Sequence, residues 1–223
     1  MGYVLPTLAS GLGVPSPNIF IETGTYLGGV PQLIMDNYKD LFYRKLYTIE
    51  LGEWQAKTAS HRYKLYEKFS FDNSRFDKHT KKQVETLERR TEYFNGRLTL
   101  INGDSSKCLS EVLSEVDEQA LIWLDAHAGA QKYARGVEDV PLFKELEAIK
   151  NHHIKNHIIA IDDAHLFGKV QYSNDPSENN KPICDYSLAT PEKVSEQIKE
   201  INTQYQTGIA SPFGHAMFIG VVK

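Results

Sequence analysis

The sequence predicts one α/β domain with a mostly parallel, doubly wound sheet and a C-terminal antiparallel strand pair. Short apolar runs alternate with segments whose apolar residues recur at helical spacing, which is typical of strands joined by crossover helices. The predicted strands are almost continuously apolar, as expected of a sheet covered by helices on both faces. Composition agrees with this class, because 223 residues that are 41% hydrophobic are enough for one large core.

Composition also narrows the class of partner and compartment. A net charge of -4 and a pI of about 6.1 give no global sign of a nucleic-acid or anionic-membrane partner. The two cysteines, Cys108 and Cys184, fit a reducing compartment. The first residues lack the features of a signal peptide, and no apolar run approaches the ~20 residues that span a bilayer. We therefore expect a soluble, cytoplasmic protein.

The elements follow in alternating order after a loop-rich lead-in. Strands are predicted at 19–22, 45–50, 97–102, 120–124 and 158–161, followed by two late strands at about 204–209 and 215–222 that form the antiparallel pair. Helices are predicted from Val30, after a cap at Ser105 or Ser106, at 139–151 and at 190–202. In the last of these, Thr190 is the expected cap and Pro191 the first helical residue.

The segment 51–96 is longer than one crossover needs and is predicted to be a helical insertion. Two helices are expected in it, at about 53–69 and 75–94, as a lid or a partner surface. Its lysines and arginines are interleaved with acids, which favours a solvated helix face over a nucleic-acid site.

Acidic residues follow five predicted strands. They are Glu22, Glu50, Asp104 with Ser105, Asp125 with His127, and Asp162-Asp163 with His165. Right-handed crossovers bring the carboxyl ends of parallel strands to one edge of a sheet, where ligands bind in open α/β folds. One such acid can simply cap the next helix, whereas five in succession favour a ligand with several hydrogen-bond donors.

The first of these strands leads into a glycine turn, Asn18–Gly29, with the sequence NIFIETGTYLGG. A strand, a glycine turn and a helix start can form a ligand site, although an ordinary tight turn has the same pattern. The spacing differs from the Gly-x-Gly-x-x-Gly of dinucleotide-binding enzymes. Glu50 follows Gly24 by 26 residues, a position suited to binding ribose hydroxyls or, alternatively, to a helix N-terminus.

Together these motifs resemble those of class I S-adenosylmethionine-dependent methyltransferases. The matching segments are FIETGTYLGG, YTIEL, INGDSS and LIWLDAH, in that order. The repeated DAH, in LIWLDAH and IDDAH, resembles the macrocin-type small-molecule O-methyltransferases, some of which use a divalent cation. The chain departs from the first motif at Tyr26 and Leu27, where the family often has a second early glycine.

The resemblance implies a Rossmann-like fold and S-adenosylmethionine as cofactor. The methionine part of the cofactor would lie along Glu22, Gly24, Thr25 and Gly28. Glu50 would bind the ribose, and Asp104 and Ser105 would contact the adenine. Asp125 would lie beside the methionine or face the substrate. His127 and His165 are candidate general bases beside Asp125, although either could be an ordinary loop histidine. His152, His153 and His157 are not expected to be ligands.

A metal site is predicted at the paired DAH segments. If the fifth strand ends before its two aspartates, Asp125, Asp162 and Asp163 could hold Mg²⁺ or Mn²⁺ beside a substrate hydroxyl. The alternative is that Asp162 caps a turn and Asp163 is solvated.

The function that we expect is methyl transfer to a hydroxyl of a small molecule, such as a sugar or polyol. The acceptor pocket would be built by 1–17, 128–138 and 166–189. No nucleic-acid or membrane partner is expected, and a homo-oligomer is left open. A non-catalytic S-adenosylmethionine-binding or assembly protein is the alternative. A nicotinamide dehydrogenase is disfavoured by the glycine spacing and the late antiparallel pair.

Overall fold

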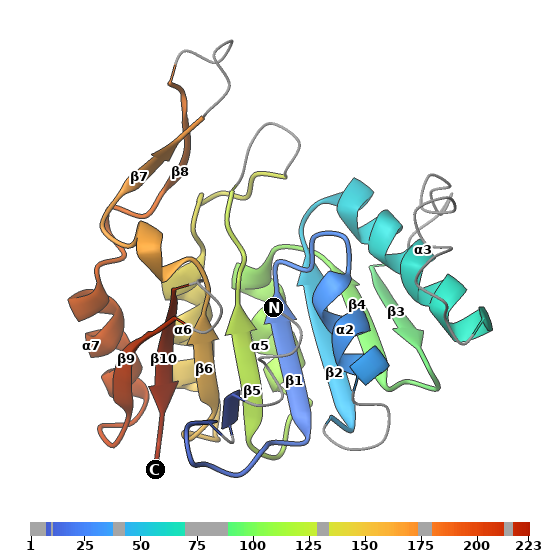
Figure 1. Ribbon diagram of the computed structural model, residues 1–223, viewed down its shortest axis with the longest axis horizontal. Helices are drawn as coiled ribbons and strands as arrows, with labels where there is room; N and C mark the ends of the chain where they lie inside the picture. The colour runs from blue at the N-terminus through green and yellow to red at the C-terminus, as the bar shows by residue number, and fades with distance from the viewer. Residues whose placement is uncertain are drawn as a thin grey trace.

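The computed structural model describes residues 8–9, 11–37, 43–69, 89–128, 134–173, 180–211 and 216–223. Its centre is an eight-stranded sheet (Figure 1). The strands lie in the order β3 (Arg90–Tyr93), β4 (Leu98–Asn102), β2 (Lys45–Glu50), β1 (Ile19–Thr23), β5 (Ala120–Leu124), β6 (Ile158–Ile161), β10 (Met217–Val221) and β9 (Gln206–Ala210). The five strands from β4 to β6 are parallel.

The predicted C-terminal antiparallel pair is confirmed. Strand β10 runs antiparallel to β6 and to β9, so the chain ends inside the sheet next to its edge strand. The doubly wound, mostly parallel sheet is confirmed with it. The described part of the chain contains no helix long and apolar enough to cross a membrane.

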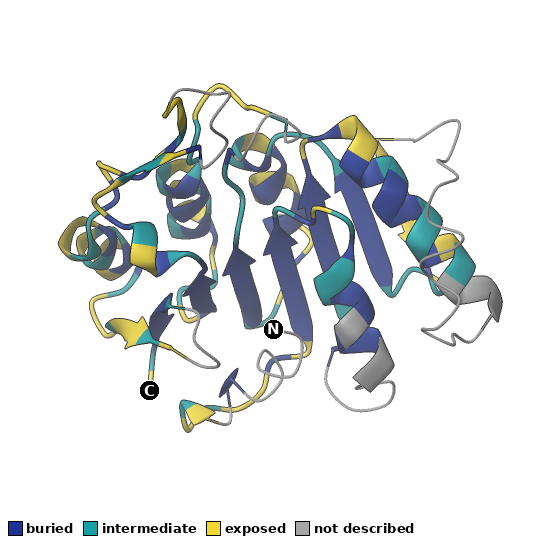
Figure 2. Ribbon diagram, turned by 45° about the horizontal axis from the view of Figure 1, so that its top comes forward, coloured by how far each residue is buried: buried dark blue, intermediate teal, exposed yellow. Residues whose placement is uncertain are grey.

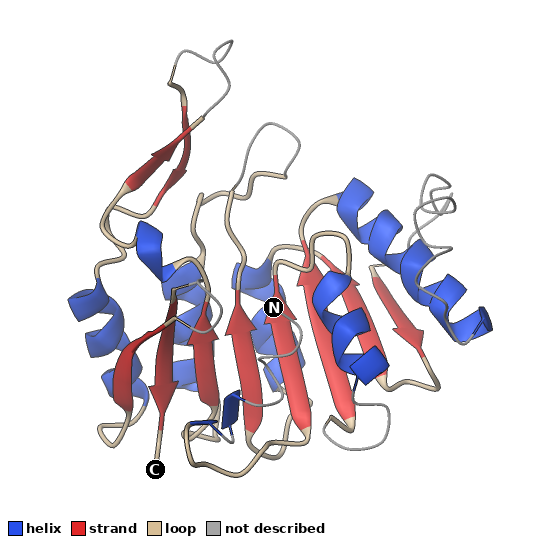
Figure 3. Ribbon diagram, in the orientation of Figure 1, coloured by secondary structure: helices blue, strands red, loops and turns tan. Residues whose placement is uncertain are grey.

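Helices cover both faces of the sheet, as Figure 3 shows. Helices α2 (Gly29–Asn37) and α3 (Glu53–Phe69) pack on one face, and α5 (Ser105–Leu113), α6 (Leu142–Asn151) and α7 (Pro191–Ile201) pack on the other. Successive strand residues serve opposite faces: Ile19 and Ile21 belong to the core under α5 to α7, and Phe20 to the core under α2 and α3. The central strands are therefore buried on both sides, as Figure 2 shows.

Part of the predicted helical insertion is wrong. Helix α3 has the predicted bounds, but Arg90–Tyr93 forms strand β3, which pairs antiparallel with β4, instead of the end of a helix over 75–94. Thr91 and Tyr93 gain a ladder of backbone hydrogen bonds beside β4, and Tyr93 is buried against Tyr63 of α3. Residues 70–88 lie outside the described residues.

Two further details differ from the predictions. Helix α5 is capped by Asp104, whose Oδ1 accepts a hydrogen bond from the Ser106 backbone N–H at 3.0 Å, and not by Ser105 or Ser106. The unpredicted strands β7 (Val170–Tyr172) and β8 (Pro182–Asp185) form a hairpin that projects beyond the carboxyl edge of the sheet (Figure 1). The start of α7 is as predicted, with Thr190 accepting from the Lys193 backbone N–H at 3.3 Å.

Candidate active site

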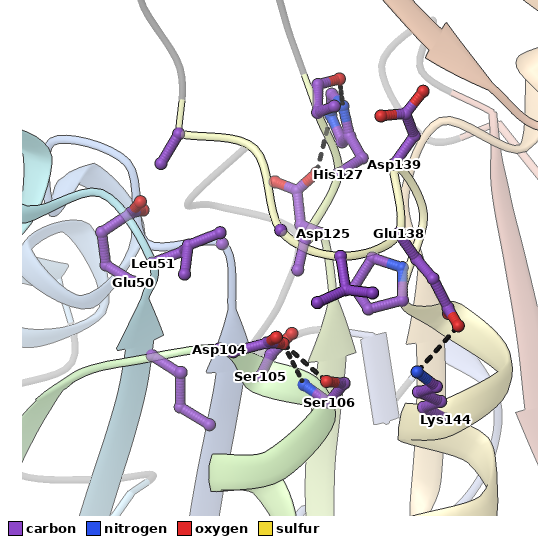
Figure 4. A pocket seen from close by; sticks show the side chains of 18 of the residues that line it. Glu50, Leu51, Asp104, Ser105, Ser106, Asp125, His127, Glu138, Asp139 and Lys144 are labelled. Atoms are coloured by element: carbon purple, nitrogen blue, oxygen red, sulfur yellow. Dashed lines mark hydrogen bonds and ion pairs between the residues drawn. The ribbon is translucent and has the colours of Figure 1, made fainter.

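A cavity of about 430 Å³ lies at the carboxyl ends of the parallel strands (Figure 4). Its walls come from the turns after β1, β2, β4 and β5, from the segment 134–144, and from the β7–β8 hairpin. Five of the predicted cofactor residues line it, namely Gly24, Glu50, Asp104, Ser105 and Asp125. The topology therefore brings the turn after β1 and the acids at the ends of β2, β4 and β5 to one edge of the sheet, as the strand order requires.

Gly24 is a position where the backbone admits no side chain. Its φ is +79°, and a Cβ built there would lie 2.3 Å from the backbone oxygen of Asp125. Its N–H donates to the backbone oxygen of Ile49 at 2.9 Å. The turn after β1 is thus pressed between the ends of β2 and β5, and glycine is needed for both its conformation and its close approach.

Glu22, Thr25 and Gly28 lie beneath the cavity wall. The Glu22 side chain is 1% exposed and accepts a hydrogen bond from the Thr48 hydroxyl at 2.6 Å, and burial raises its pKa well above the usual range. The Thr25 hydroxyl also bonds to Thr48. A Cβ at Gly28 would lie 2.7 Å from the Tyr63 hydroxyl oxygen of α3. In this structure these three residues support the turn from inside.

Glu50 is held by backbone donors. The N–H groups of Tyr26 and Gly52 donate to its two carboxylate oxygens at 2.6 and 2.8 Å. Burial raises the pKa of Glu50 to about 7 against these hydrogen bonds, which lower it. Tyr26 makes its contact with a φ of +51°, a conformation that glycine adopts without cost. The departure from the family motif at Tyr26 thus carries backbone strain at the cavity mouth.

Asp104 lies on the cavity floor at the start of α5. Besides capping the helix, its Oδ1 accepts from the Ser106 hydroxyl at 2.6 Å. The segment 134–139 passes over it: a Cβ on Gly136 would lie 3.9 Å from Asp104 Oδ2 and 3.5 Å from a Leu51 methyl carbon. Leu51 and Val137, which are 37% and 85% exposed, add apolar surface to the same part of the cavity.

At the other end of the cavity, Asp125, His127 and Asp163 form a compact cluster. One potential ligand atom from each lies within 4.8 Å of the others. His127 Nε2 is 3.3 Å from Asp163 Oδ2 and 3.9 Å from Asp125 Oδ1. Each of the three side chains is about a quarter exposed, and Asp125 and His127 line the cavity.

The hydrogen bonds of His127 define its protonation. Its Nδ1 is 2.8 Å from the backbone oxygen of Ala128, so this nitrogen carries a proton and donates it. Nε2 then faces two carboxylates. Burial lowers the pKa of His127, but hydrogen bonds to Asp163, Cys184 and Ala128 and the charge of Asp125 raise it to about 11. With nothing else bound, His127 is an imidazolium at neutral pH.

The structure places the two aspartates after β6 differently. β6 ends at Ile161, and Asp163 adopts a left-handed conformation with a φ of +53°, which directs it to His127. Asp162 is 5% exposed, accepts a hydrogen bond from the Asp163 backbone N–H at 2.8 Å, and borders a second, smaller cavity. The cluster in the described structure therefore contains His127 with Asp125 and Asp163, and Asp162 borders the smaller cavity.

His165 lies outside the cavity lining. It follows Asp163 in the short 3-10 helix η2 (Ala164–Leu166), and its side chain is 56% exposed. Its Nδ1 is 3.7 Å from Asp163 Oδ1, on the opposite oxygen from His127. Of the two candidate bases, the geometry favours His127 as the residue of the site.

Several lining residues had no sequence signal. Gln171 and Ile183 of the β7–β8 hairpin face the cavity, and Arg135 ties the hairpin to the segment 134–139. The Arg135 guanidinium donates to the Ile183 backbone oxygen at 2.9 Å and pairs with Asp139 at 3.3 Å. Lys144 pairs with Glu138 at 2.8 Å (Figure 4). The contact between Arg135 and Ile183 joins segments far apart in the chain, so no local sequence pattern predicts it.

The strand order, with its parallel core and final antiparallel pair, is that of the class I methyltransferase-like fold. The sequence matches no protein-family model and no curated protein. Solved structures do match. A protein from Klebsiella pneumoniae proposed to be an O-methyltransferase gives a TM-score of 0.54 at 17% identity, covering 100% of this chain and 79% of that one.

Two further structures were solved with the cofactor or its product. An O-methyltransferase from Bacillus cereus in complex with S-adenosylhomocysteine gives a TM-score of 0.54 at 14% identity, covering 100% of this chain and 80% of that one. TomG from Streptomyces achromogenes, an O-methyltransferase involved in tomaymycin synthesis and bound to S-adenosylmethionine, gives 0.51 at 14% identity, covering 100% and 79%. The chain thus has the fold of S-adenosylmethionine-dependent O-methyltransferases, as the sequence resemblance implies.

Proposed function

We propose that the protein is an S-adenosylmethionine-dependent methyltransferase that methylates a hydroxyl of a small molecule, such as a sugar or polyol, in the cytoplasm. The observation that carries the proposal is the cavity at the carboxyl edge. It joins the Glu50 and Asp104 side to Asp125 and His127 in one space of about 430 Å³, and Asp163 lies 3.3 Å from His127. That volume lies within the roughly 300–1,000 Å³ of small-molecule sites.

The cofactor occupies the half of the cavity near β1, β2 and β4. The backbone at Gly24 lies along its methionine part, and Glu50 accepts hydrogen bonds from the ribose hydroxyls. Asp104 would accept from the adenine amine with Ser105 nearby, and Leu51 and Val137, which line the same part of the cavity, would supply apolar contacts to the adenine. Glu22, Thr25 and Gly28 hold this wall in place from beneath instead of touching the cofactor.

The acceptor hydroxyl binds at the other half. The bound cofactor would supply the methyl group by direct displacement from its sulfonium, so the protein would have to align the two reactants, exclude water and remove a proton. Since His127 is protonated at neutral pH, a carboxylate of the cluster takes that proton, and the imidazolium stabilises the negative charge that develops on the hydroxyl oxygen. The 134–139 segment and the β7–β8 hairpin supply the remaining walls.

The same cluster fits a divalent cation, with Asp125, His127 and Asp163 as the ligands and Asp162 behind them. Two carboxylates and one imidazole suit Mn²⁺ better than Mg²⁺, which prefers oxygen ligands. A cation bound there would lower the pKa of an acceptor hydroxyl. The Nε2 of His127 faces both carboxylates, which is the arrangement in which a neutral imidazole can share an ion with them.

Calorimetry and a transfer assay test the proposal together. S-adenosylmethionine and S-adenosylhomocysteine should bind at one site per chain and NAD should not, and labelled methyl should appear in a hydroxyl acceptor from a sugar and polyol screen. No binding of either sulfur compound to the folded protein contradicts the proposal. Binding without transfer across the screen supports the non-catalytic alternative. An unchanged melting temperature with Mn²⁺, together with turnover that survives a chelator, excludes the metal.

A further inference from the structure

Tyr186 is a buried aromatic residue at the base of the β7–β8 hairpin. It follows β8 directly and is 4% exposed. Its backbone N–H donates to the Lys169 backbone oxygen at 2.8 Å, on the chain that leads into β7. Its backbone oxygen accepts from the N–H groups of Gly168 and Ala189 at 3.1 and 2.9 Å. The main chain of Tyr186 is therefore held from both sides of the hairpin base.

The ring of Tyr186 belongs to a row of aromatic rings that begins in the sheet. Phe218 of β10 contacts Phe167, with ring centroids 5.8 Å apart. Phe167 in turn stacks on Tyr186, with centroids 6.2 Å apart and planes 27° apart. Favourable aromatic pairs have centroids about 4.5–7 Å apart, and all three residues are buried. The row therefore anchors the Tyr186 ring in the core on the side of β10.

The row ends at His127. The Tyr186 and His127 ring centroids lie 6.0 Å apart, with planes tilted by 55°. His127 belongs to the loop after β5, so no helix or strand holds its main chain. Its hydrogen bond to the Ala128 backbone oxygen and its ion pair with Asp163 both act at ring nitrogens, whose N–H bonds lie in the plane of the ring. The contact with Tyr186 adds a restraint against tilting out of that plane.

Tyr186 lies behind the cluster and not in the wall of the main cavity. It borders the smaller cavity, which Asp125 and Asp162 also line, and it is not among the residues that line the larger one. A reactant bound in the main cavity would therefore meet His127 and Asp125 before it could reach Tyr186. Any effect of Tyr186 on the reaction must pass through the residues that it touches.

We propose that Tyr186 is a positioning residue of the active site, which holds the His127 ring in its orientation toward the carboxylates of Asp163 and Asp125. The inference rests on the proposed methyltransferase function, in which the imidazolium stabilises charge that develops on the acceptor oxygen. A tilt of the ring would move Nε2, and a misplacement of about 1 Å can cost about 100-fold in rate. Cofactor affinity should not change, because the turns after β1, β2 and β4 build that side of the cavity.

Three variants separate the ring contact from the hydroxyl and from simple loss of core packing. Tyr186→Leu keeps an apolar side chain without the ring, and should lower kcat by about 10- to 100-fold with unchanged S-adenosylhomocysteine affinity. Tyr186→Phe keeps the ring and should recover most of the wild-type kcat. Tyr205→Leu is the matched control, because Tyr205 is 2% exposed and its hydroxyl donates to the His157 backbone oxygen at 2.7 Å, at the opposite edge of the sheet. It should lower the melting temperature and leave kcat per folded molecule unchanged.

NMR of the ligand-free protein tests the position of His127 without any reaction. The His127 Nδ1–H, which donates to Ala128, should exchange slowly with water in the wild type and in Tyr186→Phe. In Tyr186→Leu it should exchange faster, because the ring tilts and this hydrogen bond opens. If Tyr186→Leu does not fold, Phe167→Leu replaces it: this variant removes the ring stacked on Tyr186 and should change kcat and exchange in the same directions by less.

The outcomes distinguish this inference from the proposed function. A folded Tyr186→Leu protein in which either kcat or the His127 Nδ1–H exchange stays at the wild-type level would overturn the inference. A Tyr186→Phe protein as impaired as Tyr186→Leu would also contradict it, because the hydroxyl and not the ring would then matter. If the wild type binds neither sulfur compound, or transfers no methyl group, the proposed function fails, and the exchange comparison alone decides whether Tyr186 holds His127.

Discussion

The two halves of the cavity are built differently. On the cofactor side, the chain itself makes the wall: Gly24 touches the Asp125 backbone, and Glu50 is held by N–H groups of residues close to it in space. On the acceptor side, the wall is made by the ionisable side chains of Asp125 and His127, with Asp163 paired to His127, and by the β7–β8 hairpin. We therefore expect substitutions that alter the backbone to impair the cofactor side, and substitutions that remove an ionisable group to impair the acceptor side.

The largest expected effect is at Gly24. Gly24→Ala forces a Cβ into the Asp125 backbone at a φ of +79°, so the turn must move. We expect S-adenosylhomocysteine binding to fall by up to about 100-fold, with a lower melting temperature, as strain of roughly 1–3 kcal/mol at such a position implies. Gly11→Ala is the control, because nothing lies within 4 Å of a Cβ there and its φ is not positive. Equal behaviour of the two variants would contradict the backbone account.

The next effect is expected at the cluster. His127→Ala and Asp163→Asn should each lower kcat by about 100-fold, within the range of general acid–base contributions, while S-adenosylhomocysteine affinity changes less than about threefold. His165→Ala, whose side chain is 56% exposed, should leave both values unchanged. Steady-state kinetics with calorimetry separates the two quantities. A parallel loss of affinity and kcat in His127→Ala would show that the halves are not independent.

A smaller effect, tied to pH, is expected at Glu50. Its pKa of about 7 means that it is protonated below neutral pH, and only the ionised form can accept from two ribose hydroxyls. S-adenosylhomocysteine affinity should therefore fall about tenfold as the pH is lowered from 8 to 6. Glu50→Gln should bind about tenfold more weakly at pH 8 and lose most of this dependence. An equally steep pH profile in Glu50→Gln would assign the titration to another group.

The smallest effect on the site is expected from a histidine pair at the opposite edge of the sheet. The Ala120 backbone N–H donates to His157 Nδ1 at 3.0 Å, so the proton of the His157 ring lies on Nε2. This Nε2 donates to His152 Nδ1 at 2.8 Å. The proton of the His152 ring therefore lies on its own Nε2, which donates to the Val116 backbone oxygen at 3.0 Å. Burial, and then the charge of His152, lowers the pKa of His157 to about 3. In each ring the unprotonated nitrogen already accepts a hydrogen bond, so a second proton could bind only by breaking that bond.

The pair should make the fold acid-sensitive without affecting the site. Because its folded pKa is depressed, the unfolded chain binds more protons between pH 6.5 and 3, so the stabilisation is complete above pH 6.5 and is lost as the pH falls. Denaturant unfolding should show a slope approaching about 1.4 kcal/mol per pH unit in this window. His157→Gln should flatten that slope, whereas His165→Gln should keep it. At pH 7, catalytic activity per folded molecule should be unchanged in His157→Gln.

The contrast between the backbone-built half of the cavity and the half built by side chains also explains which features the sequence could predict. The sheet, the glycine turn and the acids at strand ends follow from apolar periodicity and from the rule that parallel strands end at one edge. The local pattern predicts a helix where strand β3 forms, because the pairing of β3 with β4 and its contact with Tyr63 outweigh that pattern. The single domain with an insertion at 51–96 stays a prediction, since 70–88 lies outside the described residues.

The site itself was predicted less completely. The roles of Asp162 and Asp163 depend on a left-handed residue after β6, which sequence alone could state only as a condition. Asp104 caps α5 in place of the serines because its carboxylate reaches two donors of Ser106. Arg135 and Gln171 take part in the site through contacts between distant segments, so they carry no local signal.

The most direct test of the two-sided cavity is a crystal structure with S-adenosylhomocysteine. The account predicts ribose hydroxyls within hydrogen-bond distance of Glu50, adenine beside Asp104 and Leu51, and the sulfur atom facing Asp125 and His127 with room for a hydroxyl between them. Binding of the ligand elsewhere, or in this cavity with the adenine against His127 and the sulfur away from the cluster, would contradict it.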